Sequence, residues 1–129
     1  MMERTLPEPT DSELAILQEL WRRGSCTVRD VYNVLSKTRT TGYTTTLKLM
    51  QIMAEKGLVT RDESRRTHVY TAAGEQANTQ KQLVSSFLER AFEGSAKALI
   101  MQAISAKESS SEELAEIREL IDSLEGGKQ

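Results

Sequence analysis

Residues able to take part in catalysis or metal binding are scarce in this chain. Cys26 is its only cysteine and His68 its only histidine. One cysteine and one histidine are too few for a metal centre built from these residues. They also leave few combinations for a nucleophile paired with a histidine base. No glycine-rich phosphate loop is present either, so we expect no metal, no cofactor and no enzyme. Cys26 is predicted to be a small buried apolar residue, and His68 a solvated strand residue.

The polar side chains with the clearest arrangement lie in the segment GYTTTLKLMQIMAEKGLV, residues 42–59. A helix over residues 43–56 places Thr44, Lys48, Gln51 and Glu55 opposite its apolar positions, with Thr45 and Ile52 at the border of that face. The candidate contacts on it are Thr44, Thr45, Lys48 and Gln51. An ordinary solvated face would alternate Glu and Lys, whereas this one is short-chained and sparsely charged. Threonine offers a hydroxyl and a methyl, glutamine can pair bidentately with adenine, and lysine reaches guanine or phosphate. The face is typical of a helix in the major groove of DNA; alternatively, the threonines only cap the helix.

A pair of arginines, Arg65 and Arg66, follows in the charged segment DESRR between two stretches that alternate as strands. At the tip of a hairpin these side chains could contact phosphates or the minor groove, or form no more than a solvated turn. Positive charge is concentrated nearby: residues 22–66 hold ten Lys and Arg against four Asp and Glu, a net charge of +6 in a chain of net charge −2. This concentration favours a polyanionic partner.

The elements that must position these side chains follow from local sequence. TDSE, residues 10–13, predicts a capping box at the start of a first helix. Residues 25–27 are too short for more than a bridging strand, and a second helix follows that ends near Lys37. After the third helix, alternation predicts strands over residues 58–61 and 67–72. This order of helices and strands is that of a winged helix-turn-helix.

From Gly74 onward the chain is predicted to be helical throughout. A second capping box, Ser110 and Glu113, opens a last helix with apolar residues at steps of three and four. This seam is too short for a stable coiled coil alone. The helices either pair with those of a second chain or form a small cap within one chain. Pairing is favoured, because a dimer can read two half-sites one helical turn or a multiple apart. The expected dimer residues are Leu83, Phe87, Leu88, Leu114, Ile117, Ile121 and Leu124.

These features predict a mostly α, α+β winged-helix protein. A winged-helix DNA-binding domain is expected over residues 1–73 and a helical dimerisation domain over residues 74–129. The chain is 38% hydrophobic and 28% charged, a composition that allows a packed core. No run is apolar enough to span a bilayer, and MMERTLPEPT at the N-terminus lacks the apolar core of a signal peptide. We therefore expect no membrane insertion and a cytoplasmic location.

The ordered set of segments resembles the penicillinase-repressor (BlaI/MecI/CopY) family of transcriptional repressors. The similarity lies in LPEPTDSELAILQELW, TVRDVYNVL and GYTTTLKLMQIMAEKGLV for the three helices, RRTHVYTA for the wing and FLERAFEGSAKALIMQAI for the dimerisation segment. It covers residues 6–124. The resemblance implies a homodimeric repressor on double-stranded operator DNA with an inverted repeat. By position it gives the groove-facing role to Thr44, Thr45, Lys48 and Gln51, and the wing role to Arg65 and Arg66.

Two features depart from that family. Its copper-responsive branch carries paired cysteines near the C-terminus, and LEGGKQ has none, so copper sensing by that route is not expected. In the β-lactam branch a membrane sensor-protease system leads to cleavage of an Asn-Phe bond in the dimerisation region. The corresponding place falls near Gln102–Ala103, where neither residue matches. The cleaved bond, the inducing signal and a link to β-lactam resistance stay open.

We therefore expect a sequence-specific repressor that acts as a homodimer and is relieved by proteolysis or another signal acting on the C-terminal half. Two other functions remain open. A winged-helix protein-interaction module would bind DNA weakly and with little dependence on salt. A ligand-sensing regulator would hold a small molecule between its C-terminal helices and would be stabilised by it.

Overall fold

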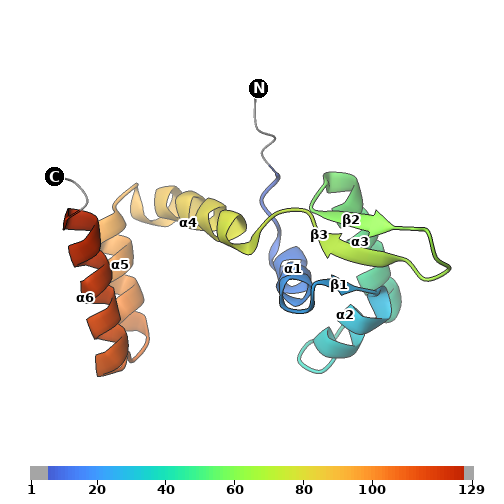
Figure 1. Cartoon of the computed structure of the whole chain (residues 1–129), viewed down its shortest axis with the longest axis horizontal. Helices are drawn as coiled ribbons and strands as arrows, with labels where there is room; N and C mark the ends of the chain where they lie inside the picture. The colour runs from blue at the N-terminus through green and yellow to red at the C-terminus, as the bar shows by residue number, and fades with distance from the viewer. Residues whose placement is uncertain (1–5, 127–129) are drawn as a thin grey trace. The chain divides into compact units, whose positions relative to one another are not determined.

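The computed structural model describes residues 6–126 (Figure 1). Its contacts divide the chain into two compact units, one that extends to Val84 and one that begins at Ser85. We call them the N-terminal and C-terminal units. The division falls inside helix α4 (Gln76–Phe92), so the first turns of that helix belong to the N-terminal unit. The predicted domain boundary, residues 73 and 74, precedes the same helix.

The N-terminal unit has the predicted winged-helix order of elements (Figure 1). Its three strands form one antiparallel sheet in the order β1-β3-β2. Ser25 and Thr60 both lie opposite Thr71, one on each side of the central strand. The elements are α1 (Asp11–Arg23), β1 (Ser25–Cys26), α2 (Val28–Leu35), α3 (Tyr43–Lys56), β2 (Val59–Asp62) and β3 (Val69–Ala72).

Two capping boxes fix where the first two helices begin. At α1 the Thr10 hydroxyl accepts from the Glu13 N–H at 3.2 Å, and the Glu13 carboxylate accepts from the Thr10 N–H at 2.9 Å. Thr27 and Asp30 make the same pair of bonds at α2, both at 3.1 Å. The first box was predicted in full. Helix α2 ends at Leu35, two residues before the predicted end.

The core of the N-terminal unit lies between α1, α2, α3 and the sheet. Cys26 is 1% exposed, which confirms the prediction that it is a buried apolar residue, and burial raises the pKa of its thiol. Tyr70 on β3 is also 1% exposed. Its neighbour Val69 is only half-buried. The fully or largely buried core residues are Ile16, Leu17, Leu20, Cys26, Val28, Val31, Met50, Met53, Leu58, Val59 and Tyr70.

An ion pair between a buried carboxylate and a partly exposed ammonium joins the start of α1 to the end of α3. Lys56 Nζ donates to Glu13 Oε2 at 2.7 Å. The Glu13 side chain is 1% exposed and the Lys56 side chain 38%. Burial raises the pKa of the Glu13 carboxyl, but the hydrogen bonds from Lys56 and Thr10 outweigh it and leave the pKa below its ordinary value. The pair therefore fixes the orientation of α3 against α1.

Two long-range hydrogen bonds hold Gly74 and the first turns of α4 against the rest of the N-terminal unit. The Trp21 indole N–H donates to the Gly74 carbonyl oxygen at 2.9 Å, and the Gln82 amide donates to the Leu6 carbonyl oxygen at 2.8 Å. Thr79 is 8% exposed. Helix α4 begins at residue 76, in agreement with the prediction that the chain is helical from Gly74 onward.

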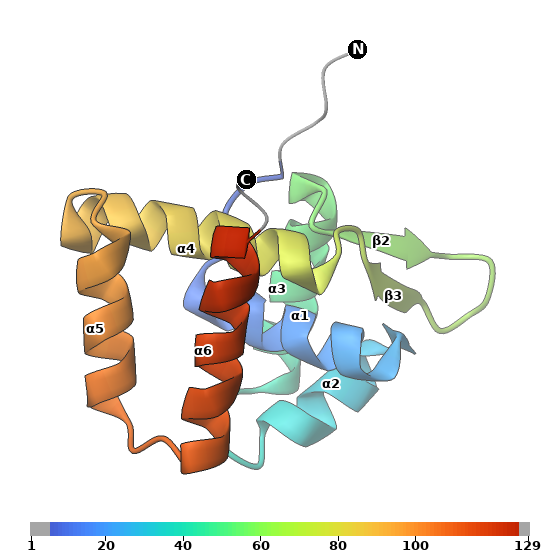
Figure 2. The same ribbon diagram turned by 60° about the vertical axis from the view of Figure 1, so that its left-hand side comes forward.

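The C-terminal unit consists of the remainder of α4 with α5 (Ala96–Ala106) and α6 (Ser111–Gly126). Helices α5 and α6 run in opposite directions (Figure 2), but they make few contacts with each other. The Glu113 N–H donates to the Ser110 hydroxyl at 3.0 Å, which is one of the two hydrogen bonds of the capping box predicted at the start of α6. No residue of α5 or α6, over residues 96–106 and 111–126, is buried. This unit has almost no core of its own.

Candidate nucleic-acid interface

The exposed face of α3 carries the four polar residues that helical periodicity placed there. Thr44, Thr45, Lys48 and Gln51 are all exposed. Thr46 on the opposite side is 2% exposed, and its hydroxyl donates to the Gly42 carbonyl oxygen at 3.1 Å. The N-cap of α3 is Gly42, which caps through no side chain, so Thr44 and Thr45 do not serve as its cap. The threonines are available to an external partner.

Thr45 lies at the border of this face, where the third helix meets the turn that follows α2. It lines a hollow of about 330 Å³ together with Arg39, Thr40 and Thr41 of that turn and Ser12 of α1. The border position had been expected from the helical angle. Hydroxyl groups and a cation at the N-terminal end of a helix are typical neighbours of a phosphate.

The wing consists of β2, β3 and the loop over residues 63–68. The loop begins with a turn at Asp62, whose carboxylate accepts a hydrogen bond from the Ser64 N–H at 2.9 Å. Arg65 and Arg66 are exposed in the loop, as predicted for a hairpin tip. The hydrogen bonds from Ser64 lower the pKa of the Asp62 carboxyl, and the positive charge of Arg65 contributes. The wing thus presents two arginines at its end.

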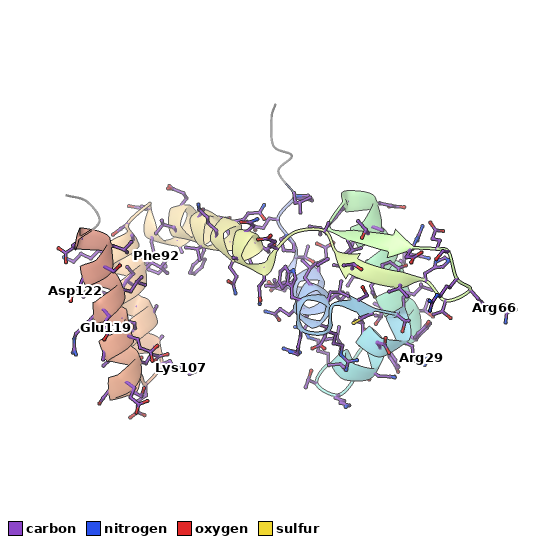
Figure 3. The ribbon with its side chains drawn as sticks, in the orientation of Figure 1. Arg29, Arg66, Phe92, Lys107, Glu119 and Asp122 are labelled. Atoms are coloured by element: carbon purple, nitrogen blue, oxygen red, sulfur yellow. The ribbon has the colours of Figure 1, made fainter. Side chains whose placement is uncertain are left out.

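A second hollow, of about 250 Å³, separates the start of α2 from the wing. We call it the α2–wing hollow. Side chains from α2, α3 and the wing line it: Arg29, Tyr43, Gln51, Arg66 and His68, with others. Figure 3 shows Arg29 on α2 and Arg66 at the end of the β2–β3 loop. His68 is half-buried and precedes β3, whereas a solvated position within a strand had been predicted.

Arg61 on β2 lies beside the other end of the α3 face. It lines a hollow of about 380 Å³ with Gln51, Ala54 and Glu55. Arg61 is the cross-strand partner of Tyr70, and its guanidinium donates to the Glu63 carboxylate at 3.4 Å. Cationic side chains therefore lie on both sides of Gln51.

Sequence reasoning did not single out Arg29 or Arg61 for a role at this surface. Each was counted only as part of the central positive charge, because periodicity within one helix or strand does not show which residues meet across elements. Arg29 lies one residue after the first residue of α2, and Tyr43 begins α3. The sequence held one indication that Arg29 and Tyr43 could meet. An arginine lies near the start of the second helix, and an aromatic residue lies at the start of the third.

Apolar side chains are exposed along the helices of the C-terminal unit. Of the predicted dimer residues, Phe87, Ile121 and Leu124 are exposed at 47%, 47% and 60%, and Leu83, Leu88, Leu114 and Ile117 are half-buried. The prediction omitted α5, which exposes Ile100, Met101 and Ile104. Exposed apolar residues in such number on one small unit are typical of a surface that another molecule covers.

Residues 6–126 contain neither a membrane-spanning helix nor a cluster of metal-ligating side chains. No helix there has the length and apolar character needed to cross a bilayer. No group of three or more His, Cys, Asp and Glu side chains there lies close enough to hold a metal ion.

The element order, the wing and the exposed α3 face define a winged helix-turn-helix protein. The family model described as "Penicillinase repressor" matches residues 9–123. The chain therefore belongs to the penicillinase repressor family, which confirms the resemblance found in the sequence.

Relatives and solved structures agree with this assignment. The Penicillinase repressor of Bacillus licheniformis is 24% identical over 119 residues, which cover 92% of this chain and 93% of that protein. The Transcriptional regulator BlaI of Mycobacterium tuberculosis is 39% identical over 61 residues, 46% of this chain and 44% of that protein. The solution structure of the DNA binding domain of the repressor BlaI matches with a TM-score of 0.51 and 25% identity, over 59% of this chain and 93% of that one. The crystal structure of the YusO protein from Bacillus subtilis shares the fold, with a TM-score of 0.54 and 16% identity over 91% of this chain and 74% of that one.

Proposed function

We propose that this protein is a DNA-binding transcriptional repressor that acts as a homodimer on an inverted-repeat operator, in the cytoplasm and without a cofactor. The observation that carries the proposal is the α3 face. Its exposed side chains are polar, with Thr44 and Thr45 at the start of the helix, Lys48 and Gln51 in the middle and Glu55 near the end, and it adjoins a wing with two cations. Membership of the penicillinase repressor family supports a repressor over an enzyme, and the match to the BlaI DNA binding domain supports DNA as the partner.

The proposed contacts divide into base readout and positioning. Lys48 and Gln51 lie in the middle of the exposed α3 face and would reach base edges in the major groove. Thr44 and Thr45 at the start of α3 would let the helix approach closely. Arg65 and Arg66 would contact phosphates or the minor groove, and so would hold the protein on DNA of any sequence.

The proposed dimer rests on the apolar faces of the C-terminal unit. Helices α5 and α6 bury no residue within one chain and make few contacts with each other. A second copy supplies the same helices and would cover Phe87, Ile121 and Leu124. Two α3 helices would then be held at a fixed separation, as an inverted repeat requires.

Relief of repression is proposed to act on the C-terminal unit, through a membrane sensor-protease system or another signal. Gln102–Ala103 lies inside α5, and both residues are exposed. A protease that takes an extended substrate would need α5 to unwind locally. A helix with no buried residue opens at small free-energy cost, and loss of α5 would remove part of the proposed dimer surface.

The proposed roles are tested by comparing two double variants on the DNA upstream of the protein's own gene and on a scrambled duplex. Replacing Lys48 and Gln51 by Ala is expected to lower affinity for the upstream duplex by about 10- to 100-fold and to affect the scrambled duplex much less. Replacing Arg65 and Arg66 by Ala is expected to weaken both duplexes alike and to reduce the salt dependence. An equal loss on both duplexes for the first variant would contradict base readout by α3. Weak binding of wild type that does not depend on salt would favour a protein-interaction module.

A further inference from the structure

The α2–wing hollow brings together three potential phosphate ligands from separate segments of the chain. Arg29 comes from the start of α2, and Arg66 and His68 from the wing. Arg29 precedes Arg66 by 37 residues and His68 by 39, so their meeting is a property of the fold. Gln51, a proposed base reader, lines the same hollow.

Arg29 is held in place by aromatic rings. Its guanidinium carbon lies 4.4 Å from the centre of the Tyr43 ring. The Tyr43 ring in turn meets the Tyr32 ring edge to face, with 5.7 Å between the ring centres. Stacking restricts the guanidinium but leaves its N–H groups free to donate, since a ring face accepts none of them in a linear hydrogen bond.

The arginines of the hollow have no acidic partner. Within residues 6–126, neither Arg29 nor Arg66 forms an ion pair with a carboxylate. Asp30 is next to Arg29 in sequence, but its carboxylate accepts from the Thr27 N–H at 3.1 Å and is committed to the helix cap. Asp62 is the acidic residue whose charge interacts with His68, and its carboxylate is bonded to the Ser64 N–H. The hollow therefore has uncompensated positive charge.

We propose that the α2–wing hollow is a phosphate-binding site, in which Arg29, Arg66 and His68 hold one backbone phosphate of bound DNA. The inference rests on the proposed function and adds α2 to the DNA-binding surface. Tyr43 is a positioning residue that orients Arg29. Because Gln51 lines the same hollow, the captured phosphate sets the register at which Gln51 meets a base edge.

The first test measures binding of the full-length protein to its upstream duplex and to a scrambled duplex across a salt series. We expect Arg29→Gln to lower affinity for both by about tenfold per subunit and to reduce the salt slope by about one per subunit. Lys81→Gln is the matched control, because it removes the same charge from an exposed position outside the hollow. Tyr43→Phe keeps the ring under Arg29 and is expected to bind as wild type does.

The second test identifies the phosphate itself. Single phosphates of the upstream duplex are replaced in turn by uncharged methylphosphonates. Wild type and Lys81→Gln are expected to lose affinity at one position in each half-site, and Arg29→Gln to be insensitive at that same position. Such coupling arises only if Arg29 and that phosphate interact.

The phosphate in the α2–wing hollow could come from DNA or from a phosphate-bearing small molecule. The NMR signals of His68 distinguish these two ligands. As the only histidine, it gives a single set of imidazole NMR signals in untagged protein. We expect these signals to shift with the upstream duplex and to stay in place with millimolar inorganic phosphate or a nucleoside monophosphate. Saturable shifts with the small molecules, in competition with DNA, would overturn the assignment to DNA.

Two further outcomes separate this inference from the proposed function. If wild type binds the upstream duplex tightly and Arg29→Gln binds as the Lys81→Gln control does, the phosphate site is wrong while the repressor function stands. If wild type binds neither duplex, both are wrong.

Discussion

Replacement of Lys56 by Met tests how α3 is held against the rest of the fold. The substitution keeps the aliphatic part of the side chain and removes the ammonium that donates to Glu13 at 2.7 Å. The Glu13 carboxylate, 1% exposed, is then left buried with only its helix-cap bonds. We expect the protein to lose stability at neutral pH because a buried charge has lost its partner.

The magnitude follows from the burial of the two ends. Removing one partner of a fully buried pair costs about 3–5 kcal/mol, and an exposed pair contributes about 0–1 kcal/mol. Glu13 is fully buried and the Lys56 side chain is 38% exposed. The expected loss in free energy of unfolding is therefore about 2 kcal/mol, equivalent to a fall of about 10 °C in Tm for a unit of this size.

The pH dependence provides an independent test of the same pair. The pKa of the Glu13 carboxyl lies below its ordinary value of 4.5. Its contribution to stability is therefore present above pH 4.5 and is lost as the pH falls through the lowered folded-state pKa. Without Lys56 the pKa of Glu13 rises, because one of the interactions that stabilise its charged form against the effect of burial has been removed. The destabilisation caused by Lys56→Met should thus shrink between pH 7 and pH 4.

Urea denaturation followed by circular dichroism at both pH values measures these differences. Lys81→Met is the control, since it removes an exposed lysine. In the Lys56→Met background, Glu13→Gln is expected to restore part of the stability, because it removes the unpaired charge and keeps an acceptor for the cap. The reasoning is refuted if Lys56→Met equals the control at pH 7, or if its effect does not change with pH.

Three other predictions concern the attachment of α4, the end of α3 and the dimer. Trp21→Phe removes the indole N–H that donates to Gly74 at 2.9 Å, and denaturation should show a loss of about 1 kcal/mol; an unchanged midpoint would mean that this bond does not contribute. Gly57→Ala, at a φ of +85°, should cost about 1 kcal/mol and lower Tm, and an equal or higher Tm would contradict the need for glycine at this helix end. Leu124→Glu, at a side chain 60% exposed in one chain, should convert a dimer to a monomer in light scattering, whereas Glu125→Gln should not; a dimeric Leu124→Glu protein would remove α6 from the interface.

Features set by neighbouring residues in the sequence were predicted well. The first capping box depends on residues three apart, and the exposed α3 face depends on a period of 3.6 residues. Both follow from local geometry that tertiary structure did not override. Family resemblance and local pattern also agreed on the residues of the exposed α3 face, because the polar side of a helix can be read from the sequence of that helix alone.

Features set by contacts between distant residues were not predicted. Glu13 was expected to cap α1, but its pairing with Lys56 joins residues 43 positions apart. The α2–wing hollow likewise depends on how α2, α3 and the wing pack, so Arg29 could not be distinguished from other mid-chain cations. The hydrogen bonds from Trp21 to Gly74 and from Gln82 to Leu6 were not predicted either, because each joins residues more than fifty positions apart.

Binding of the purified protein to the DNA upstream of its own gene tests the central claim most directly. Fluorescence anisotropy is followed over a salt series, with a scrambled duplex of the same length and composition as the control. The account predicts a preference for the upstream duplex of about 1,000-fold or more, two chains for each inverted repeat, and a logarithmic affinity that falls linearly with the logarithm of salt concentration. Equal affinity for the two duplexes, or one chain for each site, would contradict a dimeric sequence-specific repressor.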